Sequence, residues 1–425
     1  MQGVPRRVTK SSRAPALFVT DAADYPHVNL AHLAVALTAA SLAVYGLMMA
    51  LFARAMLRRR PSPIGNVARA PRVTIFKPLA GCDDELEENL ESFARLDYPA
   101  FEVLLGVASP SDPAYGAALR FAARHPKLDA RVVVTDPLAA INPKVAQLIG
   151  LERVATGDAY VISDSNVRVP PTYLWSLVAE LADADVGMVT SLFAGTGERT
   201  LGAALENLQI CASTTPGIAA MDAVSDRPLT VGKSMAVRRR DLARLGGFRP
   251  VADVLAEDHV LGRRFLDAGF QVRTSLDIVE NRNVGCTVAR TIERHTRWAK
   301  MRRSLLASGF AAEPVLTPVV VATGGLGLAP SRATMAVLVA ACLVQTTCAL
   351  LAVRLLRGRA MAWRYAPLEI VRSYVAFACW LRAWASRRIA WRGHPFLLCR
   401  GSVIVPAEAG AASSAAQAAL GASNP

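Results

Sequence analysis

The acidic residues that could take part in chemistry stand where apolar runs end or where a helical pattern begins. Asp164 directly follows the β-branched and aromatic run 159–163, which predicts a buried strand. Asp112 follows a second predicted strand, 101–108, and Asp258 is the second residue of a helical pattern. A carboxylate at the carboxyl end of a strand can hold a divalent cation, and the cation can hold a diphosphate. Turns and helix N-termini also favour acids, so position alone leaves a purely structural role open.

Basic residues complement these acids. Lys144 lies at the start of a predicted helix and is a candidate cation for a phosphate. The basic run 294–303 contains Arg294, Arg297 and Trp298, and it precedes the apolar last third of the chain. A basic helix facing a membrane would have the same composition. The alternative is that these basic residues belong to a site for group transfer, because a departing diphosphate needs positive charge of this kind.

Three acids and one basic unit occur in the order and approximate spacing of the D, D, D, (Q/R)xxRW set of lipid-acting glycosyltransferases: Asp112, Asp164, Asp258 and Arg294-x-x-Arg297-Trp298. On these motifs the chain resembles the ceramide glucosyltransferase family, well over about residues 72–314 and loosely beyond. The matching stretches are 77–81, 89–93, 96–99, 101–105, 142–144, 162–169, 256–258, 297–302 and 389–393. The combination is specific, whereas any one motif alone is weak.

The resemblance implies a cytosol-facing glycosyltransferase domain of the GT-A type, a nucleotide-sugar donor and a lipid acceptor. By position, Asp112 would contact the nucleotide, Asp164 would ligate a Mg or Mn ion and the diphosphate, and Asp258 would be the catalytic base. The basic unit would bind donor phosphate and acceptor, through Arg294, Arg297 and Trp298. Asn166 departs from the family, which usually has Gly there. Only one acid is therefore present at the position where the resemblance implies a divalent cation.

Strand and helix patterns alternate at short spacing between residues 73 and 163, which predicts an α/β domain with a doubly wound sheet of parallel strands. The predicted strands are 73–76, 101–107, 131–135, 159–163, 187–193, 230–237 and one beginning at 270. The predicted helices are 85–95, 115–124, 143–154, 201–211 and one following 257.

Apolar segments flank this domain. Residues 29–53 carry no charge and are long enough to span a bilayer, as are residues 333–353. Two weaker segments, 314–331 and 366–385, could span, re-enter or lie in the interface. Arginines follow the first segment, so the positive-inside rule predicts a cytoplasmic domain. The expected divisions are a tail at 1–28, a transmembrane helix at 29–53, a cytosolic GT-A domain at 69–313, membrane segments at 314–388 and a tail at 389–425.

The composition agrees with a membrane enzyme that has anionic partners. The 425 residues have a net charge of +14 and are 52% hydrophobic. Nucleic acid is not expected as a partner, because the basic residues flank apolar segments and form no stripe with aromatics. The seven cysteines form no CxxC pair and no zinc spacing. The Ala- and Arg-rich composition is typical of a bacterium, which suggests an inner membrane.

The sequence therefore predicts an inverting, multi-pass membrane hexosyltransferase that uses UDP-glucose or a related UDP-sugar on ceramide. A hopanoid, diacylglycerol or polyprenyl phosphate acceptor would leave the chemistry unchanged. A membrane-tethered binding protein or an export component is the alternative from another class.

Overall fold

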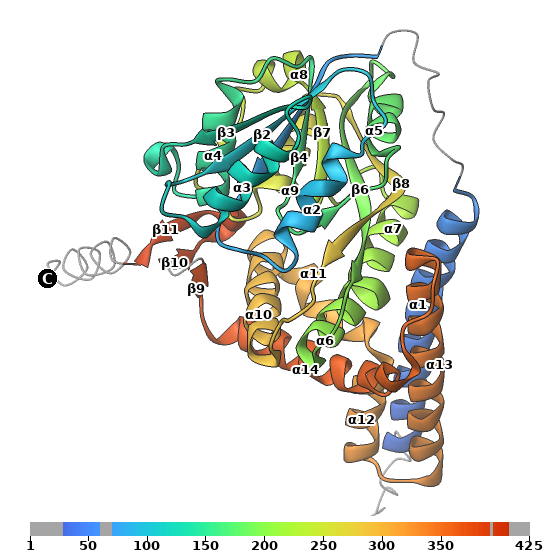
Figure 1. Ribbon diagram of the computed structural model, residues 1–425. Coiled ribbons are helices and arrows are strands. Elements are labelled where there is room, and N and C mark those ends of the chain that lie inside the picture. The colour runs from blue at the N-terminus through green and yellow to red at the C-terminus, as the bar shows by residue number, and fades with distance from the viewer. Residues whose placement is uncertain (1–28, 60–69, 392–393, 408–425) are drawn as a thin grey trace, which may run out of the picture.

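The computed structural model describes residues 29–59, 70–391 and 394–407. The expected tail at 1–28 and the Ala/Ser/Gly-rich end lie outside these residues. One eight-stranded sheet forms the centre of the molecule, with the strand order β3-β2-β1-β4-β7-β6-β8-β5 (Figure 1). Its strands are β1 (Val73–Pro78), β2 (Phe101–Val107), β3 (Asp129–Val134), β4 (Ala159–Ser163), β5 (Val167–Arg168), β6 (Val186–Thr196), β7 (Ser234–Arg238) and β8 (Gln271–Arg282).

The sheet is mixed, which corrects the expectation of parallel strands. β1 pairs in parallel with β2 and β4, and β2 with β3, as predicted. β7 is antiparallel to both β4 and β6, and the short β5 is antiparallel to β8. Two antiparallel steps across β7 return β6 to the direction of β4, and β8 runs parallel to β6. The carboxyl ends of β1, β2, β4, β6 and β8 therefore lie at one edge of the sheet, where α/β folds bind ligands.

Helices cover both faces of the sheet because successive strand residues point to opposite sides. Ile75 of β1 joins one core cluster with Phe93, Phe121 and Tyr173, which come from α2, α3 and α5. Its neighbour Phe76 joins the other cluster, with residues of α4, α8 and α9. The helices are α2 (Leu86–Ala94), α3 (Pro113–Arg124), α4 (Pro143–Glu152), α5 (Tyr173–Leu181), α6 (Leu201–Gln209), α7 (Thr215–Val224), α8 (Arg239–Arg244), α9 (Glu257–Asp267) and α10 (Val288–Leu305).

A second, three-stranded antiparallel sheet lies within the segment predicted as a C-terminal tail. Its strands are β9 (Arg388–Trp391), β10 (His394–Leu398) and β11 (Ile404–Pro406). The apolar side chains of Ile389 and Phe396 pack with Leu255, just ahead of α9. The Leu255 N–H donates to the carbonyl oxygen of Ser402 at 2.8 Å. This small sheet therefore holds the segment that leads into the Glu257–Asp258 pair.

Two helices are long and apolar enough to cross a membrane, namely α1 (Leu30–Leu57) and α13 (Arg332–Arg357). A third candidate is a bent pair at 307–328 with an angle of 78° between its halves; its second half is α12 (Pro318–Leu328). α12 and α13 run in opposite directions beside α1 (Figure 1). The chain is therefore a membrane protein with two such helices, or three if the bent pair crosses, among the described residues.

The predicted segment 366–385 forms α14 (Leu368–Ala385), which is not among the candidate spans. It runs crosswise to α12 and α13 (Figure 1), and its Ser373 contacts Gln345 near the middle of α13. Its Glu369 and Arg372 are buried and form an ion pair at 2.5 Å, and Gln345 of α13 donates to Glu369 at 2.9 Å. The position of this segment relative to the membrane stays a prediction.

Candidate active site

Asp164 is held between two lysines at the carboxyl end of β4. The ammonium nitrogen of Lys144 lies 2.8 Å from one carboxylate oxygen, and that of Lys233 lies 3.1 Å from the other. Lys144 projects from the first turn of α4, where the side chain of Asn142 caps the helix. Lys233 lies just ahead of β7, the neighbour of β4 in the sheet. The strand pairing thus brings together charges that are about 70 residues apart in the chain.

Lys144 connects this acid to the pair that opens α9. Its ammonium nitrogen is also 2.8 Å from a carboxylate oxygen of Glu257, which is buried. Asp258 is half-buried and points elsewhere: its Oδ2 accepts a hydrogen bond from the Gly232 N–H at 2.5 Å. Lys144 donates to the carbonyl oxygen of the same glycine at 3.3 Å. Asp164, Lys144, Glu257 and Asp258 therefore form one cluster around Gly232.

The charges and burial of this cluster shift the pKa values of its carboxylates in opposite directions. Burial alone would raise the pKa of Asp164, but Lys144 and Lys233 outweigh burial and hold that pKa well below its usual range. Burial raises the pKa of both Glu257 and Asp258 above their ordinary values, and Lys144 opposes this rise only in part. An ionised acid therefore stands beside a pair with raised pKa values, an arrangement that suits acid–base chemistry.

Asp112 closes the adjacent strand end. Its Oδ1 accepts hydrogen bonds from the Ala114 N–H, as the N-cap of α3, and from the Gly81 N–H, each at 2.8 Å. Gly81 follows β1 and has a positive φ of 66°, a conformation that favours glycine. Among the described residues, Oδ2 of Asp112 has no hydrogen bond of its own. The structure therefore supports a structural role for Oδ1 and leaves Oδ2 available to a ligand.

The side chains of the basic unit on α10 have different partners. Arg294 pairs with Glu206 of α6 at 2.8 Å, and both burial and this acid act on its pKa, with a net rise. Arg297 donates to the carbonyl oxygen of Ala390 in β9 at 3.4 Å. Trp298 packs edge-on against His295, with 5.0 Å between ring centroids. Donor binding by this unit stays a prediction.

Three residues of the cluster were not predicted from the sequence. Gly232 and Lys233 lie within the range 230–237, where the apolar pattern indicated only a strand. Lys77, in β1, is fully buried and donates to the backbone oxygen of Asp164. Burial lowers the pKa of Lys77 to about 7, although Asp164 partly offsets this. A lysine within a strand of apolar residues was the available signal for Lys77.

A divalent cation fits this site only if a lysine moves. The described residues contain no group of three or more His, Cys, Asp or Glu side chains that could hold a metal ion. Asp164 and the Asn166 amide offer the oxygen ligands that Mg²⁺ and Mn²⁺ prefer. Lys233 occupies both, since its ammonium nitrogen also lies 3.0 Å from Oδ1 of Asn166. Displacement of Lys233, with donor phosphate oxygens completing the coordination, would make the set suitable.

The mixed sheet, with its acids at the carboxyl ends of parallel strands, is the GT-A-like architecture of glycosyltransferases. The mannosyltransferase PcManGT of Pyrobaculum calidifontis, in complex with GDP-Man and Mn²⁺, is similar in fold, with a TM-score of 0.50 and 23% identity. The alignment covers 84% of this chain and 98% of that one. The chain belongs to glycosyl transferase family 21, whose sequence model matches residues 34–404.

Named relatives agree with this family. The chain is 25% identical over 247 residues to ceramide glucosyltransferase 3 of Caenorhabditis elegans, an alignment that covers 58% of this chain and 53% of the relative. It is 38% identical over 101 residues to the ceramide glucosyltransferase of Komagataella phaffii, covering 23% and 20% respectively. The chain spans about half the length of the C. elegans relative. The resemblance inferred from the motifs is therefore confirmed at the level of the family.

Proposed function

We propose that this protein is a membrane hexosyltransferase that transfers a sugar, glucose in the first instance, from a UDP-sugar to the hydroxyl of a lipid, with ceramide as the acceptor. The observation that carries the proposal is the cluster around Gly232, in which Lys144 joins Asp164 to the Glu257–Asp258 pair. The names of the relatives support ceramide among the lipid acceptors.

Asp258 is the proposed general base. A lipid hydroxyl is a weak nucleophile near neutral pH, and it needs a carboxylate to take its proton as the bond to the sugar carbon forms. Asp258 suits this role better than Glu257, because it is half-buried and carries no ion pair to Lys144, whereas Glu257 is buried against that lysine. The bond between the sugar carbon and the diphosphate breaks in the same step, which inverts the configuration at that carbon.

Asp164, Lys144 and Lys233 are proposed to receive the donor diphosphate. The leaving nucleoside diphosphate gains negative charge during transfer, and cations fixed beside it stabilise that charge. Lys144 and Lys233 supply two such cations, and a Mg or Mn ion at Asp164 would supply a third. Asp112 would contact the nucleotide, and Arg294, Arg297 and Trp298 the donor phosphate and acceptor.

The membrane helices suit a substrate that stays in the bilayer. α1 and α13 anchor the domain at the membrane, and α10 lies between the sheet edge and α14 (Figure 1). The arginines that follow α1 favour a cytoplasmic domain, where nucleotide sugars are made. A bacterial inner membrane remains an expectation from composition.

Membranes that contain the full chain, incubated with labelled UDP-sugars and a panel of lipids, would test this proposal. Ceramide, diacylglycerol and a hopanoid alcohol would be compared, with lipid extracts separated by chromatography. Labelled glycosylceramide from UDP-glucose is the expected product. If the sugar is transferred only to another lipid, the proposed acceptor is wrong. If a preparation that binds UDP forms no glycolipid, the proposed activity is contradicted.

A further inference from the structure

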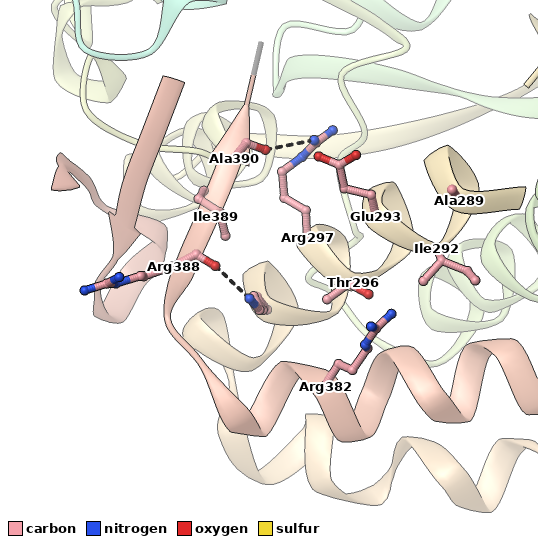
Figure 2. Close-up of a pocket in the computed structure, with 10 residues that line it drawn as sticks. Ala289, Ile292, Glu293, Thr296, Arg297, Arg382, Arg388, Ile389 and Ala390 are labelled. Carbon is pink, nitrogen blue, oxygen red and sulfur yellow. Dashed lines mark hydrogen bonds between the residues drawn. The ribbon is translucent and has the colours of Figure 1, made fainter. Parts of the chain in front are cut away.

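A cavity of about 410 Å³ lies between α10, α14 and β9 (Figure 2). One face of α10 lines it, including Thr296, Arg297 and Lys300, and α14 contributes Arg382. The backbone of β9 forms a further wall, because Lys300 donates to the carbonyl oxygen of Arg388 at 2.6 Å. Of these residues, the proposed transfer reaction uses Arg297 but neither Lys300 nor Arg382.

The lining of this cavity carries a net positive charge. Glu293 is its single carboxylate, against the cations Arg297, Lys300, Arg382 and Arg388. Figure 2 shows the guanidinium of Arg388 pointing away from the cavity, so three cations remain around it. Like charges crowd together here, since burial and then the neighbouring arginines 303 and 382 lower the pKa of Lys300. Among the described residues, the guanidinium of Arg382 has no ion pair to an acid. An anion inside the cavity would relieve this repulsion.

The cavity lies at the side of a helix whose exposed face is apolar. Val371, Tyr374, Leu381 and Trp384 of α14 are 40% to 51% exposed. Their spacing of three, seven and three residues places them on one stripe of the helix. α14 runs crosswise to α12 and α13 (Figure 1), the orientation that a helix in the membrane surface would have. The positive cavity and the apolar stripe therefore belong to one membrane-facing surface.

We propose that this cavity binds the phosphate headgroup of an anionic glycerophospholipid, with Lys300 and Arg382 as its main ligands. The apolar stripe favours a lipid over free phosphate, because the acyl chains of a lipid could lie along α14 while its headgroup enters the cavity. Such a lipid would connect α10 to α14 and so fix the domain against the bilayer. It is neither donor nor acceptor of the proposed transfer.

The test measures lipid binding to the full chain, purified in a zwitterionic detergent, by native mass spectrometry. Phosphatidylglycerol and phosphatidylcholine are added in equal amounts. The wild type should retain phosphatidylglycerol in preference. Arg382→Gln and Lys300→Gln should each lower that retention about fivefold, the effect of one basic residue near a membrane surface. Arg354→Gln is the matched control, because Arg354 is an exposed cation of α13 outside the cavity.

Arg382 is exposed, so its substitution leaves folding intact even if that of Lys300 does not. Equal retention of the two lipids by the wild type would overturn the proposal. So would unchanged phosphatidylglycerol retention in Arg382→Gln, or an equal loss in Arg354→Gln. Displacement of the bound lipid by inorganic phosphate alone would show an anion site without lipid preference, and would also overturn it. UDP affinity, measured on the same samples, should be the same in all variants, which keeps this result separate from the transfer activity.

Discussion

The ammonium nitrogen of Lys144 lies 2.8 Å from the carboxylate of Asp164, and this ion pair connects the start of α4 to the end of β4. The same nitrogen reaches Glu257 at an equal distance. One lysine thus sets the charge both where the donor diphosphate is expected and where the base is expected. The predictions below examine this cluster residue by residue.

A side chain at Gly232 should shift Lys144 and Asp258 from their positions. An added Cβ would lie 2.7 Å from the Lys144 ammonium and 3.0 Å from Oδ2 of Asp258. Gly232→Ala should therefore displace both groups and lower kcat on the order of 100-fold, as small misplacements of catalytic groups do. Gly217→Ala is the control, because its Cβ would meet nothing within 4 Å. Equal kcat in the two variants would show that the close approach at Gly232 has no catalytic role.

The acidic limb of the pH–activity profile should depend on Lys144. Asp258 must be ionised to accept a proton, and its raised pKa places the loss of activity at a higher pH than for an ordinary aspartate. Lys144 lowers this pKa, so Lys144→Met should move the limb to still higher pH. Lys233→Met should leave the limb in place, since Lys233 acts on Asp164. If the acidic limb stays at the same pH in Lys144→Met, then Lys144 does not set the pKa of the catalytic base.

Lys233 should compete with a divalent cation for Asp164. Lys233→Met frees a carboxylate oxygen and the Asn166 amide oxygen, and removes a repelling charge. Mn²⁺ affinity in the presence of UDP, measured by electron paramagnetic resonance titration, should rise about tenfold or more. Asp164→Asn should abolish this binding. Unchanged Mn²⁺ affinity in Lys233→Met would mean that the ion binds elsewhere or is not used.

Asp112 should have two roles, as the N-cap of α3 and as a contact of the nucleotide, and two substitutions can distinguish them. Asp112→Ala removes the N-cap of α3, which typically costs about 1 kcal/mol of stability, and should also weaken UDP binding. Asp112→Asn keeps an oxygen for the two N–H donors and should weaken UDP binding alone. Asp136→Ala removes another cap and serves as the stability control. Normal UDP affinity in Asp112→Asn would remove Asp112 from the donor site.

Much of the fold could be predicted from the sequence because its patterns are local. The strands at 101–107 and 159–163 were predicted at the bounds that the structure has. Strand direction is not local: β7 is antiparallel because of the connections before and after it, which no residue pattern specifies. β9 to β11 were assigned to a tail because they have little apolar surface of their own and gain a core only against residues such as Leu255.

Part of the candidate site could likewise be predicted from the sequence, and part could not. Asp112, Asp164 and Asp258 were identified by motif order, and the structure places each at a strand end or helix start. Lys233 was missed because its significance depends on strand pairing that brings it to Asp164. Arg294 pairs with Glu206 of α6, a contact that no sequence spacing could indicate, and its role in donor binding stays a prediction.

The comparison of Asp258→Asn with Glu257→Gln, at one pH near neutrality, tests the central claim most directly. Transfer to the lipid and UDP affinity are measured on the same preparations. Asp258→Asn keeps the shape of the side chain and removes the proton acceptor, so turnover should fall by about 10²–10⁴-fold with UDP affinity nearly unchanged. Glu257→Gln should cost less, because Glu257 acts through its ion pair with Lys144. Near-normal turnover in Asp258→Asn, or the larger loss in Glu257→Gln, would contradict the assignment of the base.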